Sequence, residues 1–181
     1  VGPADEVETT YITNLSNHTF LLQPYGVIRY DAAGYTTRMN RINEKMRATD
    51  MHYTQKVSNY SIDYSEPTYN YTELRASKVA PAPEMENYLA LPKTLPDRVR
   101  TLAQEITNSS KSAYEKARAI ERYFGRNGFV YDTKNVAIPE KNQDYVDQFL
   151  FETKVGYCDN FSTAMVVMLR SIDIPARWVK G

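Results

Sequence analysis

The stretch that decides the fold is VGYCDNFSTAMVVMLRSIDIPAR, residues 155–177, which holds Cys158, the only cysteine of the 181-residue chain. Apolar side chains recur along this stretch at helical spacing and form one stripe: Phe161, Ala164, Met165, Met168 and Ile172. The spacing predicts an amphipathic helix that begins at about Tyr157 or Cys158. The helix cannot continue through Pro175.

The thiol of Cys158 has two interpretations. A single cysteine at the start of a helix is most often a small buried apolar side chain. However, Cys158 follows a loop, so its thiol would face the free N–H groups and the positive end of the helix dipole, which favour a nucleophilic thiolate. Gly156 permits a close approach of the backbone to a bound substrate. Both interpretations stay open on position alone; in the catalytic one, the backbone at Tyr157 and Cys158 would bind a developing oxyanion.

The residues before this stretch, from about residue 97, are also typical of helices. After Pro96, which suits a first helical position, one apolar stripe is formed by Val99, Leu102, Ala103 and Ile106. Ser112 and Glu115 have the spacing of a capping box, and the stripe that follows is formed by Ala113, Ala117, Ile120 and Phe124. Residues 129–131 indicate a short strand, and Asp144 is expected to cap a short helix.

The first part of the chain, to about residue 75, has the composition of strands. Tyr60, Ile62 and Tyr64 alternate with polar residues, which is typical of a half-buried strand, and residues 19–22 and 26–30 are strand-like too. Residues 35–49 allow a short helix, since Met39, Ile42 and Met46 share helical spacing. The proline-containing stretch 76–96 is expected to be a linker. We place the domain boundary near residue 85, between a β-rich region, 1–85, and a second domain, 86–181.

Composition excludes several classes of function. Basic and acidic residues balance at 22 each, and no basic cluster indicates a nucleic-acid partner. A single cysteine excludes an internal disulfide, and His18 and His52 lack the spacing of metal ligands. We therefore expect no cofactor and no metal. The Asn-x-Ser triplet at Asn160 is interpreted as a chance match. No run of eighteen apolar residues predicts a membrane span.

Several spaced motifs resemble the transglutaminase-like superfamily, in particular its bacterial membrane-anchored branch. The resemblance covers about residues 85–181, and its core consists of GYCDNFSTAM at 156–165 and LRSIDIPAR at 169–177. The supporting motifs upstream are YLALP at 88–92, LPDRV at 95–99, ARAIERY at 117–123 and DQFLF at 147–151. The resemblance implies an α+β fold, in which a β-rich N-terminal part precedes the helical front half of a papain-like core.

The resemblance also implies a mechanism. Cys158 matches the nucleophile of a Cys–His–Asp triad, which attacks a glutamine carboxamide or a peptide-type carbonyl and forms a thioester. The family's His and Asp lie on strands after the stretch that matches 174–177. We therefore expect these 181 residues to be a piece that stops before them and is inactive alone. His18 and His52 precede the cysteine, the reverse of the family order, and are expected to be surface or turn residues.

One position departs from the family pattern. Asp173 stands where the motif usually has glycine, which would adopt a left-handed backbone at the helix end. Aspartate tolerates that conformation better than most residues, so the fold is expected to survive.

The resemblance further implies partners and a location. We expect protein or peptide substrates, including cell-wall or surface peptides, and a parent protein anchored in the bacterial cell membrane with this region on its extracellular face. Residues 177–180 are expected to begin a strand, whose exposed edge would favour self-association.

Two other functions stay open. The domain could be a non-catalytic binding or scaffold module that keeps the fold, with the tyrosine-rich N-terminal part as its interaction surface. The enzyme could also be a peptidase or amidase, because water and an amine can both accept the acyl group.

Overall fold

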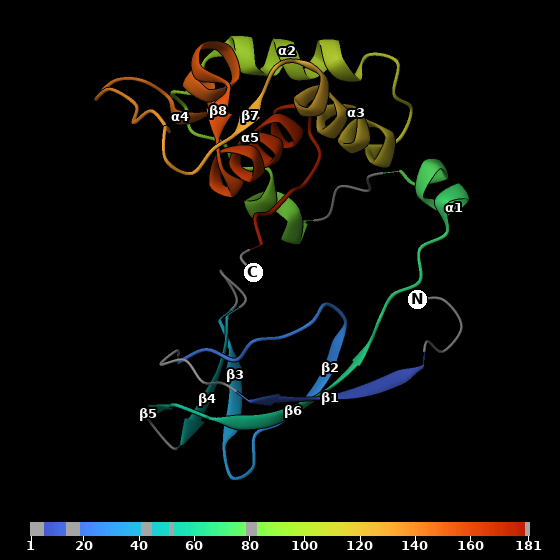
Figure 1. The fold of residues 1–181 in the computed structure, drawn as a ribbon. Helices are drawn as coiled ribbons and strands as arrows, with labels where there is room; N and C mark the ends of the chain where they lie inside the picture. The colour runs from blue at the N-terminus through green and yellow to red at the C-terminus, as the bar shows by residue number, and fades with distance from the viewer. Residues whose placement is uncertain (1–5, 14–18, 41–44, 51–52, 79–82, 180–181) are drawn as a thin grey trace. The chain divides into compact units, whose positions relative to one another are not determined.

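The computed structural model describes residues 6–13, 19–40, 45–50, 53–78 and 83–179. The chain divides into two compact units, residues 1–69 and 70–181 (Figure 1). The division therefore lies between Tyr69 and Asn70, whereas the sequence analysis placed a boundary near residue 85. Each unit has its own buried core.

The first unit consists of two three-stranded antiparallel sheets. One sheet has the strand order β1 (Val7–Thr13), β6 (Asn59–Ser65), β2 (Val27–Asp31). The other has the order β3 (Thr36–Met39), β4 (Met46–Asp50), β5 (Tyr53–Gln55). The strand-rich composition of the N-terminal part correctly predicted this architecture.

Strand β6 supplies the core of the first unit. Tyr60 and Ile62 are buried, as their alternation predicted. The Tyr60 hydroxyl accepts a hydrogen bond from the Leu22 N–H (2.6 Å) and donates one to the Leu22 carbonyl (3.0 Å). Residues 19–22 form no strand. Hydrogen bonds from Leu22 to the Tyr60 hydroxyl connect this segment to β6 instead.

The short helix considered for residues 35–49 is wrong. Met39 and Met46 are directly paired across the antiparallel strands β3 and β4, and Ile42 lies outside the described residues. The helical spacing of the three apolar residues was therefore fortuitous, because cross-strand pairing determined the local structure.

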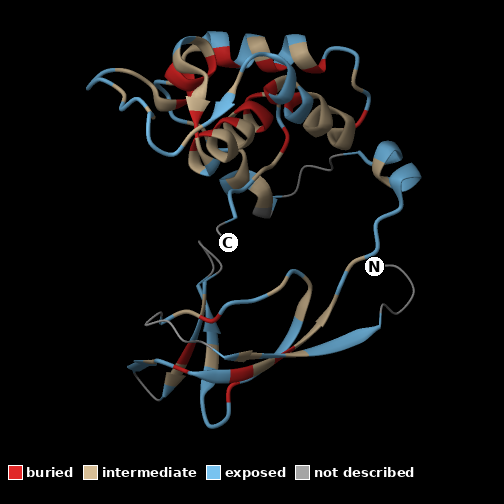
Figure 2. Cartoon of the chain, in the orientation of Figure 1, coloured by how far each residue is buried: buried red, intermediate tan, exposed pale blue. Residues whose placement is uncertain are grey.

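The second unit is mainly helical. Its elements in chain order are α1 (Tyr71–Ala76), η1 (Pro83–Tyr88), α2 (Asp97–Thr107), α3 (Ala113–Arg126), β7 (Val130–Tyr131), α4 (Tyr145–Gln148), η2 (Phe149–Thr153), β8 (Val155–Gly156) and α5 (Cys158–Ser171). Helices α2, α3 and α5 contact one another, and the buried residues gather where they meet (Figure 2). The helices predicted after residue 96 are present. Helix α1 was not predicted, and η1 lies in the stretch expected to be a linker.

Both predicted helix caps are present. The Ser112 hydroxyl accepts a hydrogen bond from the Glu115 N–H (3.2 Å), but the Glu115 carboxylate reaches the Lys111 N–H (2.7 Å), one residue before the capping-box position. The Asp144 carboxylate accepts from the N–H groups of Val146 (2.9 Å) and Asp147 (3.0 Å). These side chains satisfy N–H groups that have no partner within their own helices.

Helix α5 ends as the sequence predicted. Asp173 has a φ of 62°, in the left-handed region. Its N–H bonds to the Arg170 carbonyl (3.1 Å), and the Ile174 N–H bonds to the Leu169 carbonyl (3.0 Å). These two bonds form a Schellman motif, in which glycine is the preferred residue at the position of Asp173.

The strand expected at residues 177–180 is not formed by its described part, because residues 174–179 belong to no strand. Hydrogen bonds to an earlier segment hold this stretch instead. The Ala176 N–H donates to the Tyr88 carbonyl (3.0 Å). The Arg170 guanidinium donates to the carbonyls of Ala176 (2.8 Å) and Ala90 (2.9 Å).

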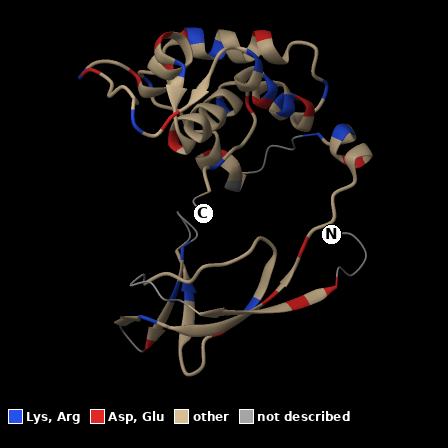
Figure 3. Ribbon diagram, viewed as in Figure 1, with Lys and Arg blue, Asp and Glu red and all other residues tan. Residues whose placement is uncertain are grey.

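Basic and acidic side chains, 22 of each in the sequence, are interspersed over both units in the view of Figure 3. Among the described residues, no helix combines the length and the apolar character needed to cross a membrane.

The left-handed residue at the end of α5 gives a stability prediction. Replacing Asp173 by glycine removes the steric cost of this backbone, so we expect the free energy of unfolding to rise by about 0.5–1 kcal/mol. Urea unfolding followed by far-UV circular dichroism measures the change. Gly128→Ala is the matched control, because Gly128 has a φ of +77° with open space around it, and it should lose about 1 kcal/mol. An Asp173→Gly variant less stable than the parent would contradict the strain argument.

Candidate functional site

Cys158 is the first residue of α5, and its side chain is exposed. The thiol Sγ lies 3.7 Å from Asp159 Oδ1, which is a weak contact. The Cys158 N–H makes no hydrogen bond within the part of the chain that the structure describes. An accessible sulfur therefore lies beside an open backbone donor at the positive end of a helix.

The backbone just before Cys158 is fixed by an unusually close contact. A Cβ atom on Gly156 would lie 2.5 Å from both Cβ and Cγ of Asn160, so no other residue fits at position 156 without movement. Asn160 is 3% exposed. Its Oδ1 accepts the Tyr157 N–H (3.1 Å), while its own N–H donates to the Tyr157 carbonyl (3.0 Å).

The bonds of Asn160 determine which of the two predicted oxyanion donors is available. The Tyr157 N–H is already bonded to Asn160, whereas the Cys158 N–H is open. Cys158 is thus the backbone donor available at the site. Gly156 approaches Asn160 closely, whereas the sequence analysis expected it to approach a substrate.

Strands β7 and β8 hold this junction in place. They pair in parallel, with Val130 opposite Val155 and Tyr131 opposite Gly156. The Asp132 N–H also donates to the Gly156 carbonyl (2.9 Å). The strand that leads into α5, β8, is therefore hydrogen-bonded to β7.

An aromatic cluster supports the first turn of α5. Phe161, one turn after Cys158, lies 5.0 Å from Phe149 and 5.6 Å from Phe124 between ring centroids, both nearly perpendicular. Tyr131 stacks on Phe161 with centroids 6.1 Å apart. Edge-to-face pairs are favourable beyond the area that they bury, so the cluster stabilises the start of the helix.

The Tyr145 phenol has a pKa above its ordinary value. Tyr145 is the first residue of α4, which contacts α5, and its side chain is half-buried. Burial raises the pKa of the Tyr145 phenol above its ordinary value, and the negative charges that Tyr157, Asp159 and Cys158 can carry raise it further.

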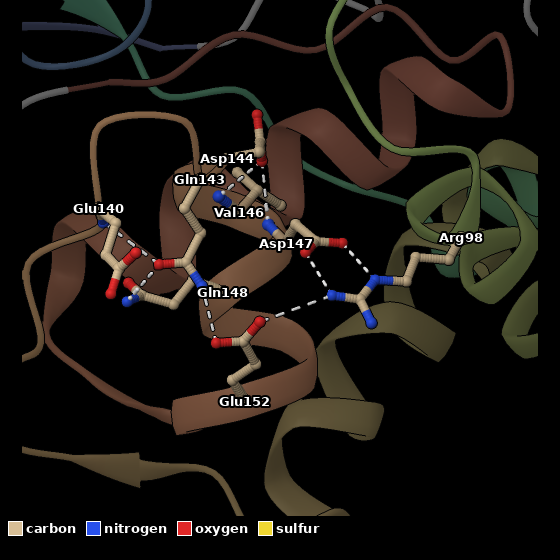
Figure 4. Close-up of polar contacts among 8 residues, drawn as sticks. All are labelled: Arg98, Glu140, Gln143, Asp144, Val146, Asp147, Gln148 and Glu152. Atoms are coloured by element: carbon tan, nitrogen blue, oxygen red, sulfur yellow. Dashed lines mark hydrogen bonds and ion pairs between the residues drawn. The ribbon is translucent and has the colours of Figure 1, made fainter.

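An ion pair anchors α4 and η2 to α2 (Figure 4). The Arg98 guanidinium binds both oxygens of the Asp147 carboxylate, with Nε 2.5 Å from Oδ1. It also lies 3.7 Å from a carboxylate oxygen of Glu152 and over the ring of Phe151. Asp147 is 6% exposed, and a buried carboxylate needs such a partner.

The loop before α4 is tied to the same network. The Gln143 amide donates to Glu152 (2.7 Å), and its carbonyl accepts from the Gln148 amide (3.1 Å) and the Glu140 N–H (3.3 Å), as Figure 4 shows. Together with the Asp144 cap, these bonds fix the point at which α4 begins. The position of Tyr145 is therefore determined by several contacts.

His18 and His52 both lie outside the described residues. Within the described ranges, no group of three or more His, Cys, Asp or Glu side chains could hold a metal ion.

The sequence analysis missed Asn160, Tyr145 and the Arg98–Asp147 pair. Glycine followed four residues later by a polar side chain in the first helical turn was the available signal for Asn160. Tyr145 follows the predicted cap Asp144, but nothing in its own sequence neighbourhood indicated that its helix contacts α5.

Comparison with known proteins identifies related sequences. Residues 100–181 match the model of the transglutaminase-like superfamily. The uncharacterized protein YebA of Bacillus subtilis (strain 168) is 46% identical over 164 residues, which cover 88% of this chain and 22% of that protein. A protein-glutamine gamma-glutamyltransferase of Pseudomonas aeruginosa is 35% identical over 108 residues, 60% of this chain and 16% of that protein. The chain thus spans about a fifth of the length of the curated relatives it matches.

Solved structures share the fold. The periplasmic domain of TgpA from Pseudomonas aeruginosa bound to ethylmercury matches with a TM-score of 0.63 at 21% identity, covering 97% of this chain and 57% of that one. A second structure of that periplasmic domain matches with a TM-score of 0.62 at 22% identity, covering 97% and 55%. The predicted α+β fold is therefore confirmed.

The contact between Gly156 and Asn160 gives a further stability prediction. Gly156→Ala places a methyl group into the Asn160 side chain, so we expect a loss of about 1–3 kcal/mol in the free energy of unfolding. Gly125→Ala is the matched control: Gly125 lies in α3 with no atom within 4 Å of an added Cβ, and alanine should stabilise the helix by up to about 1 kcal/mol. Equal stabilities of the two variants in urea unfolding would show that the junction tolerates a side chain.

Proposed function

We propose that this chain, whose residues 100–181 match the model of the transglutaminase-like superfamily, is the nucleophile-bearing part of a thiol enzyme that transfers or hydrolyses acyl groups. One observation carries the proposal. The sulfur of Cys158 is exposed at the first position of α5, beside its own open backbone N–H. A cysteine that served only to fill the core would be buried.

The proposed chemistry begins with acyl transfer to sulfur. The Cys158 thiolate attacks the carbonyl carbon of a glutamine carboxamide, and the carbonyl electrons move to oxygen to give an oxyanion. When this intermediate collapses, the C–N bond breaks, and the nitrogen leaves as ammonia after taking up a proton. A thioester remains on Cys158, and an amine or water then attacks it and restores the thiol.

The proposal requires a base, which the superfamily resemblance assigns to a histidine after the stretch 174–177. Residues 159–181 contain no histidine. We therefore propose that residues 1–181 alone form the thioester with an activated donor but do not turn over. In the whole protein, a histidine oriented by an aspartate would remove the thiol proton and return it later.

Transfer to an amine is favoured over hydrolysis by the name of one relative, the protein-glutamine gamma-glutamyltransferase of Pseudomonas aeruginosa. The proposed substrates are proteins or peptides, including cell-wall or surface peptides. The proposed location is outside the cytosol, in a protein anchored in the cell membrane. The periplasmic origin of the TgpA domain supports that location.

A second function, a non-catalytic binding module, is favoured by exposed aromatic residues of the first unit. Tyr11 is 84% exposed, Tyr53 74% and Tyr25 72%. Tyrosine is frequent in protein interfaces because a large apolar ring carries a polar hydroxyl. The reactivity of the Cys158 thiol toward an acyl donor distinguishes the catalytic function from the binding function.

The catalytic proposal predicts a half-reaction. We expect p-nitrophenyl acetate to acetylate Cys158 in the native chain, detected by mass spectrometry, and Cys158→Ala to abolish the modification. We expect a glutamine-donor peptide with a primary amine to give no cross-linked product. No labelling of the native thiol would favour the binding module. Thiol-dependent cross-linking by these 181 residues would contradict the proposal that they do not turn over alone.

Self-association is a separate proposal. Trp178 and Val179 are exposed apolar side chains, and exposed apolar surface on two copies of the chain can pack together. Sedimentation velocity over a concentration series should show a growing dimer fraction. A chain that remains monomeric at the highest concentration would refute it.

A further inference from the structure

Strand β7 has one open edge. Among the residues that the structure describes, it pairs with β8 alone, in a two-stranded parallel sheet. The Val130 N–H donates to the Lys154 carbonyl (2.8 Å). The Asp132 N–H donates to the Gly156 carbonyl (2.9 Å). Because backbone groups of successive strand residues point to opposite sides, the N–H and the carbonyl of Tyr131 point away from β8. No described residue bonds to either group.

This open side of β7, which we call the β7 edge, is accessible and unprotected. Both residues of the strand are exposed, Tyr131 by 64% and Val130 by 53% (Figure 2). Proteins commonly block exposed edges with lysine, proline or a bulge. Strand β7 contains neither lysine nor proline, and its pairing with β8 has no register shift. Because the strand is short, the β7 edge suits a short extended segment better than a second sheet.

Printed contacts of the chain place the β7 edge at the start of α5. Tyr131 is paired with Gly156, which precedes Cys158 by two residues. The Tyr131 ring stacks on Phe161, one turn after Cys158, with ring centroids 6.1 Å apart. The side chain of Tyr131 therefore lies on the face of β7 that is turned toward the first turn of α5.

We propose that the acyl-donor substrate binds as an extended peptide that adds a strand to the β7 edge and presents a glutamine side chain to Cys158. This inference deepens the proposed function and rests on it. An extended polypeptide is the ligand that matches a strand edge, because its own N–H and carbonyl groups bond to the unpaired ones. In an antiparallel pair, a single peptide residue exchanges both bonds with Tyr131.

The pairing sets where the peptide's side chains point. Directly opposed residues on neighbouring strands carry their side chains on the same face. The peptide residue opposite Tyr131, and those two positions away, would therefore face the start of α5. The peptide backbone would run about 10 Å from the line of β8, which is two strand spacings. A glutamine and a cysteine side chain that extend toward each other span most of that distance.

The β7 edge would select the conformation of a substrate more than its sequence. Backbone bonds are the same for every residue except proline, which has no N–H, so many flanking sequences would bind. A helical segment would not bind, because its N–H and carbonyl groups already bond to each other. The substrate class is therefore an unfolded, glutamine-containing stretch of a protein or peptide.

Alkylation of Cys158 measures this binding without any acyl chemistry. The peptide reagent is an alanine pentapeptide whose central residue, a diaminopropionic acid, carries a chloroacetyl group on its side chain. Chloroacetamide is the same electrophile without the peptide. With both, the sulfur displaces chloride, a thioether forms and the thiol proton goes to solvent. We expect the peptide to label the 181-residue chain about tenfold faster, the gain from two backbone hydrogen bonds, as followed by mass spectrometry.

Methylated peptides test the pairing without changing the protein. In an added strand, alternate N–H groups face β7. Methylation of the nitrogens of the central and the two terminal residues removes the donors on one side, and methylation of the two intervening nitrogens removes those on the other. We expect only the first peptide to lose its advantage over chloroacetamide.

A pair of variants tests the Tyr131 N–H. Proline is tolerated on an edge strand where the missing N–H faces away from the sheet. Tyr131→Pro removes the ring and the N–H, whereas the matched control, Tyr131→Ala, removes the ring alone. We expect Tyr131→Pro to react with the peptide between about two- and tenfold more slowly than Tyr131→Ala, the effect of one lost hydrogen bond. The two variants should react equally fast with chloroacetamide.

The outcomes separate this inference from the function on which it rests. A peptide advantage that is lost with the first methylated peptide and in Tyr131→Pro supports it. No advantage over chloroacetamide in the parental chain overturns it, as does an advantage that survives both changes. If Tyr131→Pro slows both reagents equally, the methylated peptides on the parental chain decide. Failure of p-nitrophenyl acetate to acetylate Cys158 would instead overturn the proposed function, and alkylation would still report whether the peptide binds.

Discussion

The close approach of Gly156 to Asn160 is the constraint on which the second unit depends. The missing side chain at Gly156 lets the Asn160 amide lie against the backbone and accept the Tyr157 N–H. That bond closes the first turn of α5 and places Cys158 at its first position. Because Asn160 is buried, it bonds to the Tyr157 N–H from inside the protein, while the Cys158 thiol is exposed to solvent.

Two kinds of interaction support this junction from different sides. The aromatic cluster around Phe161 packs under the first turn of α5 without any requirement for directed polar groups. The Arg98–Asp147 pair fixes α4 through directed bonds. A four-residue helix such as α4 is not stable by itself, so the cap and the ion pair are what give Tyr145 a defined position.

The local features of the second unit were predictable because they depend on short spacings. The caps at Ser112 and Asp144 and the apolar stripe of α5 follow from spacings within single helices, whereas the left-handed Asp173 was expected from the family motif that it departs from. The features that the sequence analysis did not predict depend on partners that are distant in the sequence. Met39 and Met46 have helical spacing but pair across two strands, and Arg98 reaches Asp147 across 49 positions. The contact of α4 with α5 has the same origin, because it joins two helices that are separated along the chain.

The arrangement separates the groups that hold the site from the groups that are available for chemistry. The side chains that position the site are already bonded: Asn160 bonds to Tyr157, Asp144 to its own helix, and Asp147 to Arg98. The Cys158 N–H, by contrast, has no hydrogen-bond partner among the described residues. In water this donor would contribute little, but where a bound substrate excludes water, a donor that is already oriented interacts strongly with a developing negative charge. The residues that make the junction rigid therefore leave unbonded a donor that an acyl-transfer step requires.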